Sequence, residues 1–312
     1  MSTFITSLRL ASPLLLLILI GFCLRKINMF DDNTNKQMSI LVFKVLLPIN
    51  IFMSIYKSDF RRAFNIKYVL FLLISTFIGA IIMALIAKRL TNDPKKLGIM
   101  IQDGVRGNHS IFGLPLALAI YGEKVGVYMA IAISFITPLL NIYGLSIFEH
   151  YENIKSSFIS RLLKVIKTPI VIFSVLGVVF NLANIVLPDE IYNTLNYISI
   201  SLTAISLINL GSGFNLKLDK RILKYLLAII VFKLIVLPAF TVTGAALLGF
   251  RNEELVAIFV MSSVPLAVSS YATAAIYDVD LDLANSAVVY SHIICAVTIP
   301  LILSIIISLG LI

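Results

Sequence analysis

Ten apolar runs, each long enough to cross a lipid bilayer, constrain this chain more than any other feature. They cover residues 8–24, 39–56, 66–87, 97–121, 125–148, 169–187, 191–210, 223–248, 255–277 and 283–311. A spanning helix needs about 20 mostly apolar residues, and a helix satisfies its own backbone hydrogen bonds in lipid. We therefore predict an all-α membrane protein with ten transmembrane helices.

The composition excludes several other classes of protein. The chain is 59% apolar and 13% charged, whereas soluble domains are about half apolar and about a quarter charged. A secreted disulfide scaffold, a nucleic-acid-binding module and a cytosolic enzyme are thereby excluded. Cys23 and Cys295 lie inside apolar runs, where free cysteine behaves as a small hydrophobe, and two cysteines make neither a disulfide framework nor a metal site. Nothing in the sequence suggests a cofactor.

The net charge of +9 is distributed unevenly between the two sides of the predicted spans. Of the 25 Lys and Arg residues, 15 follow spans one, three, five and seven, and 7 lie on the opposite side. Cytoplasmic loops carry the excess of positive charge, so we expect both termini outside the cytoplasm and a multi-pass protein of the cell membrane. The cluster of positive charge over residues 57–67 opposes this orientation.

The second half of the chain repeats the first. An offset of 156 residues aligns Pro13 with Pro169, Gly21 with Gly177, and residues 119–121 with residues 275–277. Five spans in each half make residues 1–155 and 156–312 an inverted pair, which is typical of transporters with a substrate site where the halves meet. The joining segment, residues 149–168, is expected to form an amphipathic helix at the cytoplasmic interface.

The fourth and ninth runs contain residues that interrupt continuous helices. Run 97–121 contains four glycines and Pro115, and run 255–277 places Pro265 among serines. A helix broken at membrane depth is tolerated where it is buried or lines a cavity. We predict two broken helices that cross near the midplane; the alternative is a simple proline kink in each.

The residues at these breaks resemble a known family. Arg106-Gly-Asn-His-Ser-Ile-Phe-Gly-Leu-Pro115, together with residues 263–271, 280–284 and 298–301, resembles the fourth, ninth and tenth helices of the auxin efflux carrier family. The resemblance implies a fold similar to sodium/proton antiporters and bile-acid symporters, with a scaffold domain and a mobile transport domain. It also implies export or exchange of small organic acids, such as indole-3-acetate, malonate or malate, and a homodimer through the scaffold. The long cytoplasmic loop of plant carriers is absent, which favours the bacterial branch.

Polar residues and helix breakers near the predicted crossing are the candidate substrate site. They are Asn108, His109, Gly113, Pro115, Pro265, Ser269, Ser270 and, from the second span, Asn50. The amide of Asn108 can donate to a carboxylate; alternatively it caps a half-helix. The prolines are expected to free backbone groups rather than touch the ligand, and the serines can bond back to their own helix instead.

Three ionisable residues inside the spans are candidates for coupling or ion pairing: Asp103, Arg106 and Lys233. Asp103 and Arg106 are three residues apart on one helix face, which suits either a mutual ion pair or a coupling role. Lys233 could neutralise Asp103 or add positive potential for an anion. His109 departs from the family pattern and is either a packed neutral side chain or a proton-coupling group. His292 is expected to pack.

These features predict a secondary transporter that moves a small organic anion by alternating access. The alternative is a sodium- or proton-coupled cation antiporter on the same fold, which would be expected to have paired carboxylates at the crossing. An intramembrane enzyme is disfavoured because the spans contain neither a metal-binding histidine motif nor a second aspartate. The expected partners are a small carboxylate and membrane lipids, with proton or sodium coupling open and no nucleic acid.

Overall fold

The structure is a computed structural model that describes residues 2–57, 60–151, 166–214, 219–274 and 277–312. Within these ranges the regular structure is helical, as predicted, apart from one isolated bridge between Gly107 and Leu266. The amphipathic helix expected over residues 149–168 and the boundary between the halves at residue 155 fall on residues 152–165, which lie outside the described ranges.

Each apolar run of the sequence contains at least one helix. Up to residue 151 the helices are α1 (Ser2–Lys26), α2 (Asp32–Leu41), η1 (Val42–Leu46), α3 (Leu47–Tyr56), α4 (Phe60–Ala63), α5 (Ile66–Leu90), α6 (Pro94–Asp103), η2 (His109–Gly113), α7 (Leu114–Tyr121), η3 (Glu123–Val125) and α8 (Gly126–Tyr151). From residue 166 they are α10 (Pro169–Leu182), α11 (Asp189–Ser212), η4 (Lys220–Ile222), α12 (Leu223–Val231), η5 (Phe232–Val236), α13 (Leu237–Leu247), α14 (Asn252–Ser263), α15 (Val268–Ala274) and α16 (Leu281–Ser308).

Six of the described helices are long and apolar enough to cross a membrane. They are Asn33–Tyr56, Ile66–Leu90, Glu123–Tyr151, Asp189–Ser212, Lys220–Leu247 and Leu281–Ser308. His109–Tyr121 and Pro169–Leu182 are shorter apolar helices. These helices support a multi-pass membrane protein, while the arrangement of all ten runs as spans stays a prediction.

Local signals explain where several helices begin and end. Asp93 accepts a hydrogen bond from a first-turn amide, and Pro94 follows it, so α6 begins there. Asp280 caps α16 in the same way. The expected run 169–187 is too long, because α10 ends at Leu182 and Asn184 takes a left-handed φ of 53°.

Three π-helical turns share one sequence signature, a Leu-Pro pair directly after the turn. Proline has no N–H, and its ring crowds the carbonyl four residues back, so the preceding turn widens. In each case the leucine N–H donates to the carbonyl five residues back: Leu47 to Val42, Leu114 to His109, and Leu237 to Phe232. The second of these turns lies at the break in the run 97–121.

Glycines allow two pairs of helices to pack very closely. Gly21 of α1 faces the backbone of Ile208 in α11, and Gly211 of α11 faces the backbone of Ile18 in α1. A Cβ atom would lie 1.9 Å from the Ile208 oxygen at the first position and 1.8 Å from the Ile18 oxygen at the second. Gly177 of α10 faces α3, where its Cβ would lie 3.2 Å from a backbone oxygen.

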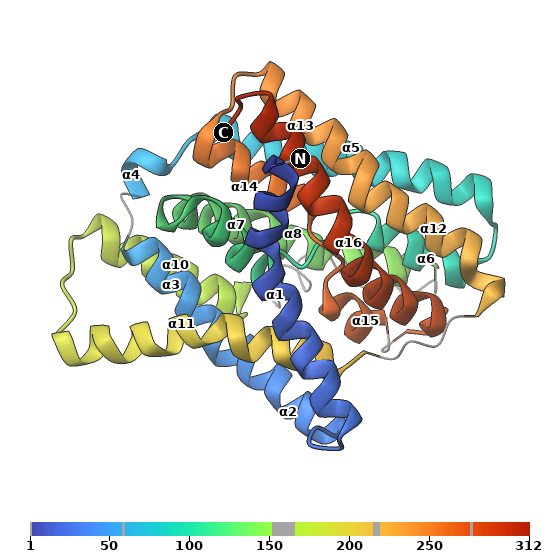
Figure 1. Cartoon of the computed structure of the whole chain (residues 1–312), viewed down its shortest axis with the longest axis horizontal. Helices are drawn as coiled ribbons and strands as arrows, with labels where there is room; N and C mark the ends of the chain where they lie inside the picture. Colours follow the sequence, from blue (N-terminus) through green and yellow to red (C-terminus); the bar gives the residue numbers. More distant parts are fainter. Residues whose placement is uncertain (1, 58–59, 152–165, 215–218, 275–276) are drawn as a thin grey trace.

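The helices form two groups. The first helix group, α1, α2, η1, α3, α10 and α11, is held by contacts such as α1 on α11 and α10 on α3. The crossing group, α5, α6, η2, α7, α8 and α12 to α16, contains both broken helices. Figure 1 shows α1, in dark blue, crossing α11 and running beside α16, so this helix also packs against the crossing group.

Candidate functional site

Two unwound segments cross at the centre of the crossing group. Residues 104–108 separate α6 from η2, and residues 264–267 separate α14 from α15. The segments pair with each other through their backbones. The backbone N–H of Asn108 donates to the Pro265 carbonyl at 2.7 Å, and the backbone N–H of Ala267 donates to the Arg106 carbonyl at 3.2 Å. Unwound backbone is costly in an apolar surrounding unless its polar groups are paired, so each break supplies partners for the other.

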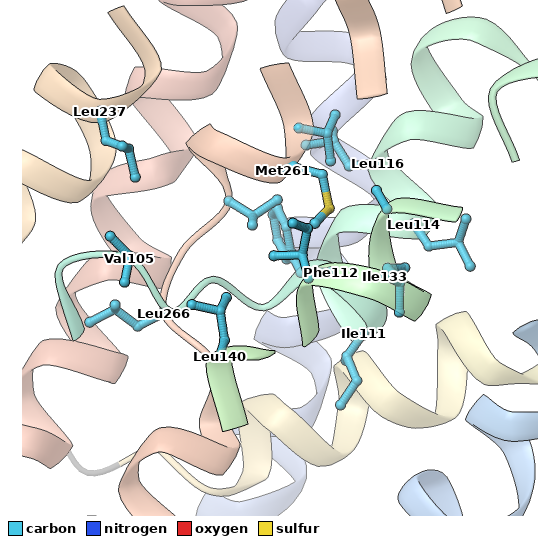
Figure 2. Close-up of a cluster of buried hydrophobic side chains, with 14 of the residues drawn as sticks. Val105, Ile111, Phe112, Leu114, Leu116, Ile133, Leu140, Leu237, Met261 and Leu266 are labelled. Atoms are coloured by element: carbon cyan, nitrogen blue, oxygen red, sulfur yellow. The ribbon is translucent and has the colours of Figure 1, made fainter. Parts of the chain in front are cut away.

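Small residues and apolar packing hold this crossing in place. A Cβ at Gly107 would lie 2.6 Å from the His109 ring and 2.8 Å from the Val264 side chain, so this position requires glycine. Figure 2 shows apolar side chains around the crossing, among them Val105, Leu266 and Phe112. Apolar side chains therefore pack around part of the crossing.

Asn108 ends the unwound segment and contacts α16. Its amide nitrogen lies 3.3 Å from the Nε2 atom of His292, whose Nδ1 atom lies 2.8 Å from the Val288 oxygen. A carbonyl accepts hydrogen bonds but cannot donate, so the Nδ1 atom carries the proton in this arrangement. The neutral ring then accepts from Asn108 through Nε2, which orients the amide and leaves its second N–H for another partner.

A cavity of about 120 Å³ lies beside the crossing. One wall is the segment from Arg106 to Ile111 with residues 267–269, and α8 contributes Thr137, Leu140 and Asn141. The opposite wall comes from the first helix group, with Phe43, Leu47 and Ile170. The cavity therefore lies between the two helix groups.

A second cavity of about 140 Å³ adjoins the first. The two cavities share Phe43, Ile111 and Val268 in their linings. Asn35, Ser39 and Asn209 line the second one and are hydrogen-bonded among themselves, with Asn209 donating to the Ser39 hydroxyl at 2.9 Å. Polar side chains therefore also reach the first helix group's side of the site.

Asp103 and Arg106 form no direct hydrogen bond with each other, but both bond to Gln102. One oxygen of Asp103, Oδ1, accepts from the Ser270 hydroxyl and from the Gln102 amide, the latter at 3.3 Å. Its other oxygen, Oδ2, is buried without a partner among the described residues. Arg106 donates to Asn141 at 2.8 Å and to the Ser269 hydroxyl and the Gln102 oxygen at 3.3 Å each. Asp103 thus connects the end of α6 to α15, and Arg106 connects the unwound segment to α8 and α15.

Comparison with known proteins identifies the chain. A profile described as "membrane transport protein" matches residues 8–303. The chain belongs to this family. It is the family of the auxin efflux carriers, as the motifs at the breaks suggested, and its members are transporters rather than enzymes.

Two archaeal relatives are similar over nearly their whole length. An uncharacterized transporter of Methanocaldococcus jannaschii is 25% identical over 285 residues, which cover 88% of this chain and 90% of the relative. An uncharacterized transporter of Methanothermobacter thermautotrophicus is 25% identical over 301 residues, which cover 96% of this chain and 98% of the relative. The chain is therefore similar to whole transporters.

The transporter brings most of the predicted site residues to the crossing. Asn108, His109 and Ser269 line the first cavity, and Ser270 bonds Asp103 beside it. The Pro265 carbonyl takes part in the backbone pairing of the two breaks. Gly113 ends η2, and Pro115 lies in the first turn of α7. Both lie among apolar side chains, so this position suits an effect on the backbone rather than contact with a substrate.

Two predicted residues of the transporter lie elsewhere. Asn50 donates to the oxygen and hydroxyl of Ser199 at 3.0 and 2.9 Å, and so joins α3 to α11 away from the linings of both cavities. Lys233 is fully buried in η5 and donates to the Ser262 carbonyl, in the last turn of α14, at 2.8 Å. A positive charge is favourable at a helix C-terminus, so this lysine stabilises the half-helix that leads into the break.

Thr137 and Asn141 line the first cavity and were not among the residues predicted from the sequence. Thr137 and Asn141 are four residues apart in an otherwise apolar run, which places them on one face of α8. That spacing was a signal available in the sequence. His292 packs as expected, against the Phe112 and Phe214 rings. Its contact with Asn108 had no local signal, because it depends on how α16 packs against the break.

Proposed function

We propose that this protein is a secondary transporter that moves a small organic anion across the cell membrane by alternating access. The observation that carries the proposal is the pair of unwound segments that cross beside a polar cavity between two helix groups. Broken helices that meet at a central site are the arrangement by which many secondary transporters hold their substrate. Membership of a transporter family supports the same reading.

The proposal includes ten spans in two inverted repeats, with the first helix group as scaffold. The glycine contacts support it. Under the offset of 156, Gly21 of α1 corresponds to Gly177 of α10. Gly21 packs on α11, which holds the seventh run, and Gly177 packs on α3, which holds the second. Equivalent glycines thus meet equivalent helices, as a two-fold axis between the halves requires.

Asn108 is proposed to bind the substrate carboxylate. Its amide is held by His292 through one N–H, and the other N–H is available to an acceptor in the cavity. An amide binds an anion without bringing a charge of its own, so it adds no charge that must be dehydrated when the site changes sides. The helix His109–Tyr121 begins directly after Asn108, and the N-terminal end of a helix favours negative charge.

The second candidate function, a sodium- or proton-coupled cation antiporter, is favoured by one observation. The Oδ2 atom of Asp103 is buried and has no partner among the described residues, and such an oxygen could take a proton or a cation. Against this candidate, Arg106 is a charged side chain in the lining of the first cavity, and a fixed cation disfavours a second one.

Electrical recording on purified proteoliposomes distinguishes these functions. Supported membranes are challenged with malonate, malate, indole-3-acetate and a neutral amide, with and without sodium and a pH step. Anion-specific currents that disappear in Asn108→Ala, with unchanged thermal unfolding, are the expected result. No current with any acid, together with a current in response to sodium or pH alone, would refute the anion transporter. The sign of the current and its dependence on pH and sodium then define coupling, and accessibility labelling of the termini tests the proposed orientation.

A further inference from the structure

One end of the crossing group carries exposed positive charge that is not paired with carboxylates. Lys88 and Arg89 lie in the last turn of α5, and Lys224 lies in the first turn of α12. All three side chains are exposed, and none of them forms an ion pair with a carboxylate among the described residues. Three neighbouring basic residues differ, because they are paired: Lys95 with Asp278, Lys96 with Asp93, and Arg221 with Asp219.

An aromatic side chain brings these helix ends together. The ring of Tyr225 in α12 lies 4.6 Å from the ammonium of Lys224 and 5.8 Å from that of Lys96 in α6. Its hydroxyl interacts with Thr91, which directly follows α5. Figure 1 shows the end of α5, the start of α6 and the start of α12 at the same edge of the molecule, on the right. Positive charges from helices far apart in the sequence therefore gather in one place.

Helix stability explains only part of this charge. Lys88 and Arg89 are favourable where they stand, because the C-terminal end of a helix attracts positive charge. Lys220 and Lys224 stand at the N-terminal end of the helix Lys220–Leu247, where the helix dipole disfavours positive charge. A bound anion would compensate these lysines, and the carboxylates of the described residues do not pair with them.

Exposed apolar side chains continue from the charged residues along both helices. On α5, Phe77, Ile81 and Leu85 are exposed and are followed by Lys88 on the same face. On α12, Leu227 and Val231 are exposed in the turns that follow Lys224. A ligand with an anionic head and an apolar tail matches both parts of this surface, whereas a free phosphate ion would meet the charged part alone.

We propose that the ends of α5 and α12 form a binding site for an anionic phospholipid, in which Lys88, Arg89 and Lys224 contact the phosphate of the headgroup. Basic clusters beside membrane-spanning helices bind such headgroups on the cytoplasmic side, and the predicted orientation places this end of the protein there. The acyl chains lie along the exposed apolar faces of the two helices. The site is separate from both cavities and does not depend on which substrate is transported.

The test measures lipid binding to the purified full-length protein by native mass spectrometry, with phosphatidylglycerol and phosphatidylcholine as probes. We expect phosphatidylglycerol to bind at least tenfold more tightly, because only its headgroup has a net negative charge. Each basic residue near the headgroup contributes about fivefold in affinity. Lys224→Gln should therefore weaken phosphatidylglycerol binding about fivefold, and the triple variant Lys88→Gln, Arg89→Gln, Lys224→Gln at least tenfold. All three side chains are exposed, so the lipid-free unfolding midpoint should not change.

The triple variant Lys26→Gln, Lys36→Gln, Lys44→Gln is the matched control. It removes the same number of exposed charges from the first helix group, on α1, α2 and η1. Its affinity for phosphatidylglycerol should stay within about twofold of the wild type. Equal losses in both triple variants, or no loss in the first, would overturn the site. Equal binding of the two lipids would do the same, and so would displacement of phosphatidylglycerol by an equal concentration of inorganic phosphate. None of these results bears on anion transport, which the electrical recordings test separately.

Discussion

The crossing of α1 and α11 makes a sharp prediction about stability. A Cβ at Gly21 would lie 1.9 Å from the Ile208 oxygen, and one at Gly211 would lie 1.8 Å from the Ile18 oxygen. Ordinary contact begins at 3.4 Å, so alanine at either site must separate the two helices by about 1.5 Å. The obstructing atoms are backbone, and no side chain can rotate away to relieve the clash.

Overpacking of this kind costs about 1–3 kcal/mol, which lowers a thermal unfolding midpoint by about 2–8 °C in a chain of this size. We expect that shift for Gly21→Ala and for Gly211→Ala, measured by far-UV circular dichroism in detergent. Gly177→Ala should cost less, since its Cβ would lie 3.1 Å or more from α3.

Gly244→Ala is the matched control for this series. Its Cβ would meet only the Phe71 ring, at 3.6 Å, within ordinary contact distance. Alanine in a helix is favoured over glycine by about 0.5–1 kcal/mol, so this variant should unfold at the wild-type temperature or slightly above it. If Gly21→Ala and Gly211→Ala both have the same unfolding midpoint as Gly244→Ala, the close approach of α1 and α11 is wrong.

Two further predictions concern the site and the N-terminal end of α6. His292→Phe keeps an aromatic ring in α16 but removes the acceptor for Asn108, so acid-dependent current should fall about two- to tenfold with no loss of expression; full current would exclude an orienting role. The hydrogen bond from the Lys96 ammonium holds the pKa of Asp93 below its ordinary value of 3.8. That contact therefore stabilises the fold at neutral pH and is lost as the pH falls below about 4. Asp93→Asn should lower the unfolding midpoint slightly at pH 7 and not at pH 3, and an equal difference at both would contradict the assignment.

Local sequence signals predicted the breaks well. Glycines and proline in run 97–121, and Pro265 in run 255–277, act on the backbone of their own segment, so the interruption of both helices follows from the residues present. The extra signature of a Leu-Pro pair after each π turn was equally local, and was not used. The end of α10 was misjudged because hydropathy continues past Leu182 while the backbone turns at Asn184.

Partners across the bundle could not be predicted in the same way. Helical spacing was the only geometry the sequence offered for Asp103 and Arg106, and it left both a mutual ion pair and a coupling role open. In the fold, Ser270 of α15 bonds to Asp103 and Asn141 of α8 bonds to Arg106, while Gln102 bonds to both. Such contacts depend on how helices far apart in sequence are packed, which no local pattern encodes.

The distribution of polar contacts gives the proposed mechanism its physical basis. Within the crossing group, backbone bonds between the two breaks and the bonds of Ser270 to α6 tie the broken helices into one unit. Within the first helix group, Asn50 ties α3 to α11. On the side of the first helix group, the cavity wall is made by the apolar side chains of Phe43, Leu47 and Ile170. Elsewhere the groups are joined by the hydrogen bond from Ser134 of α8 to Ser174 of α10 and by packing of α1 on α16. Under the proposed function, a substrate bound at Asn108 would stay with the crossing group, because the bonds between the two breaks belong to that group.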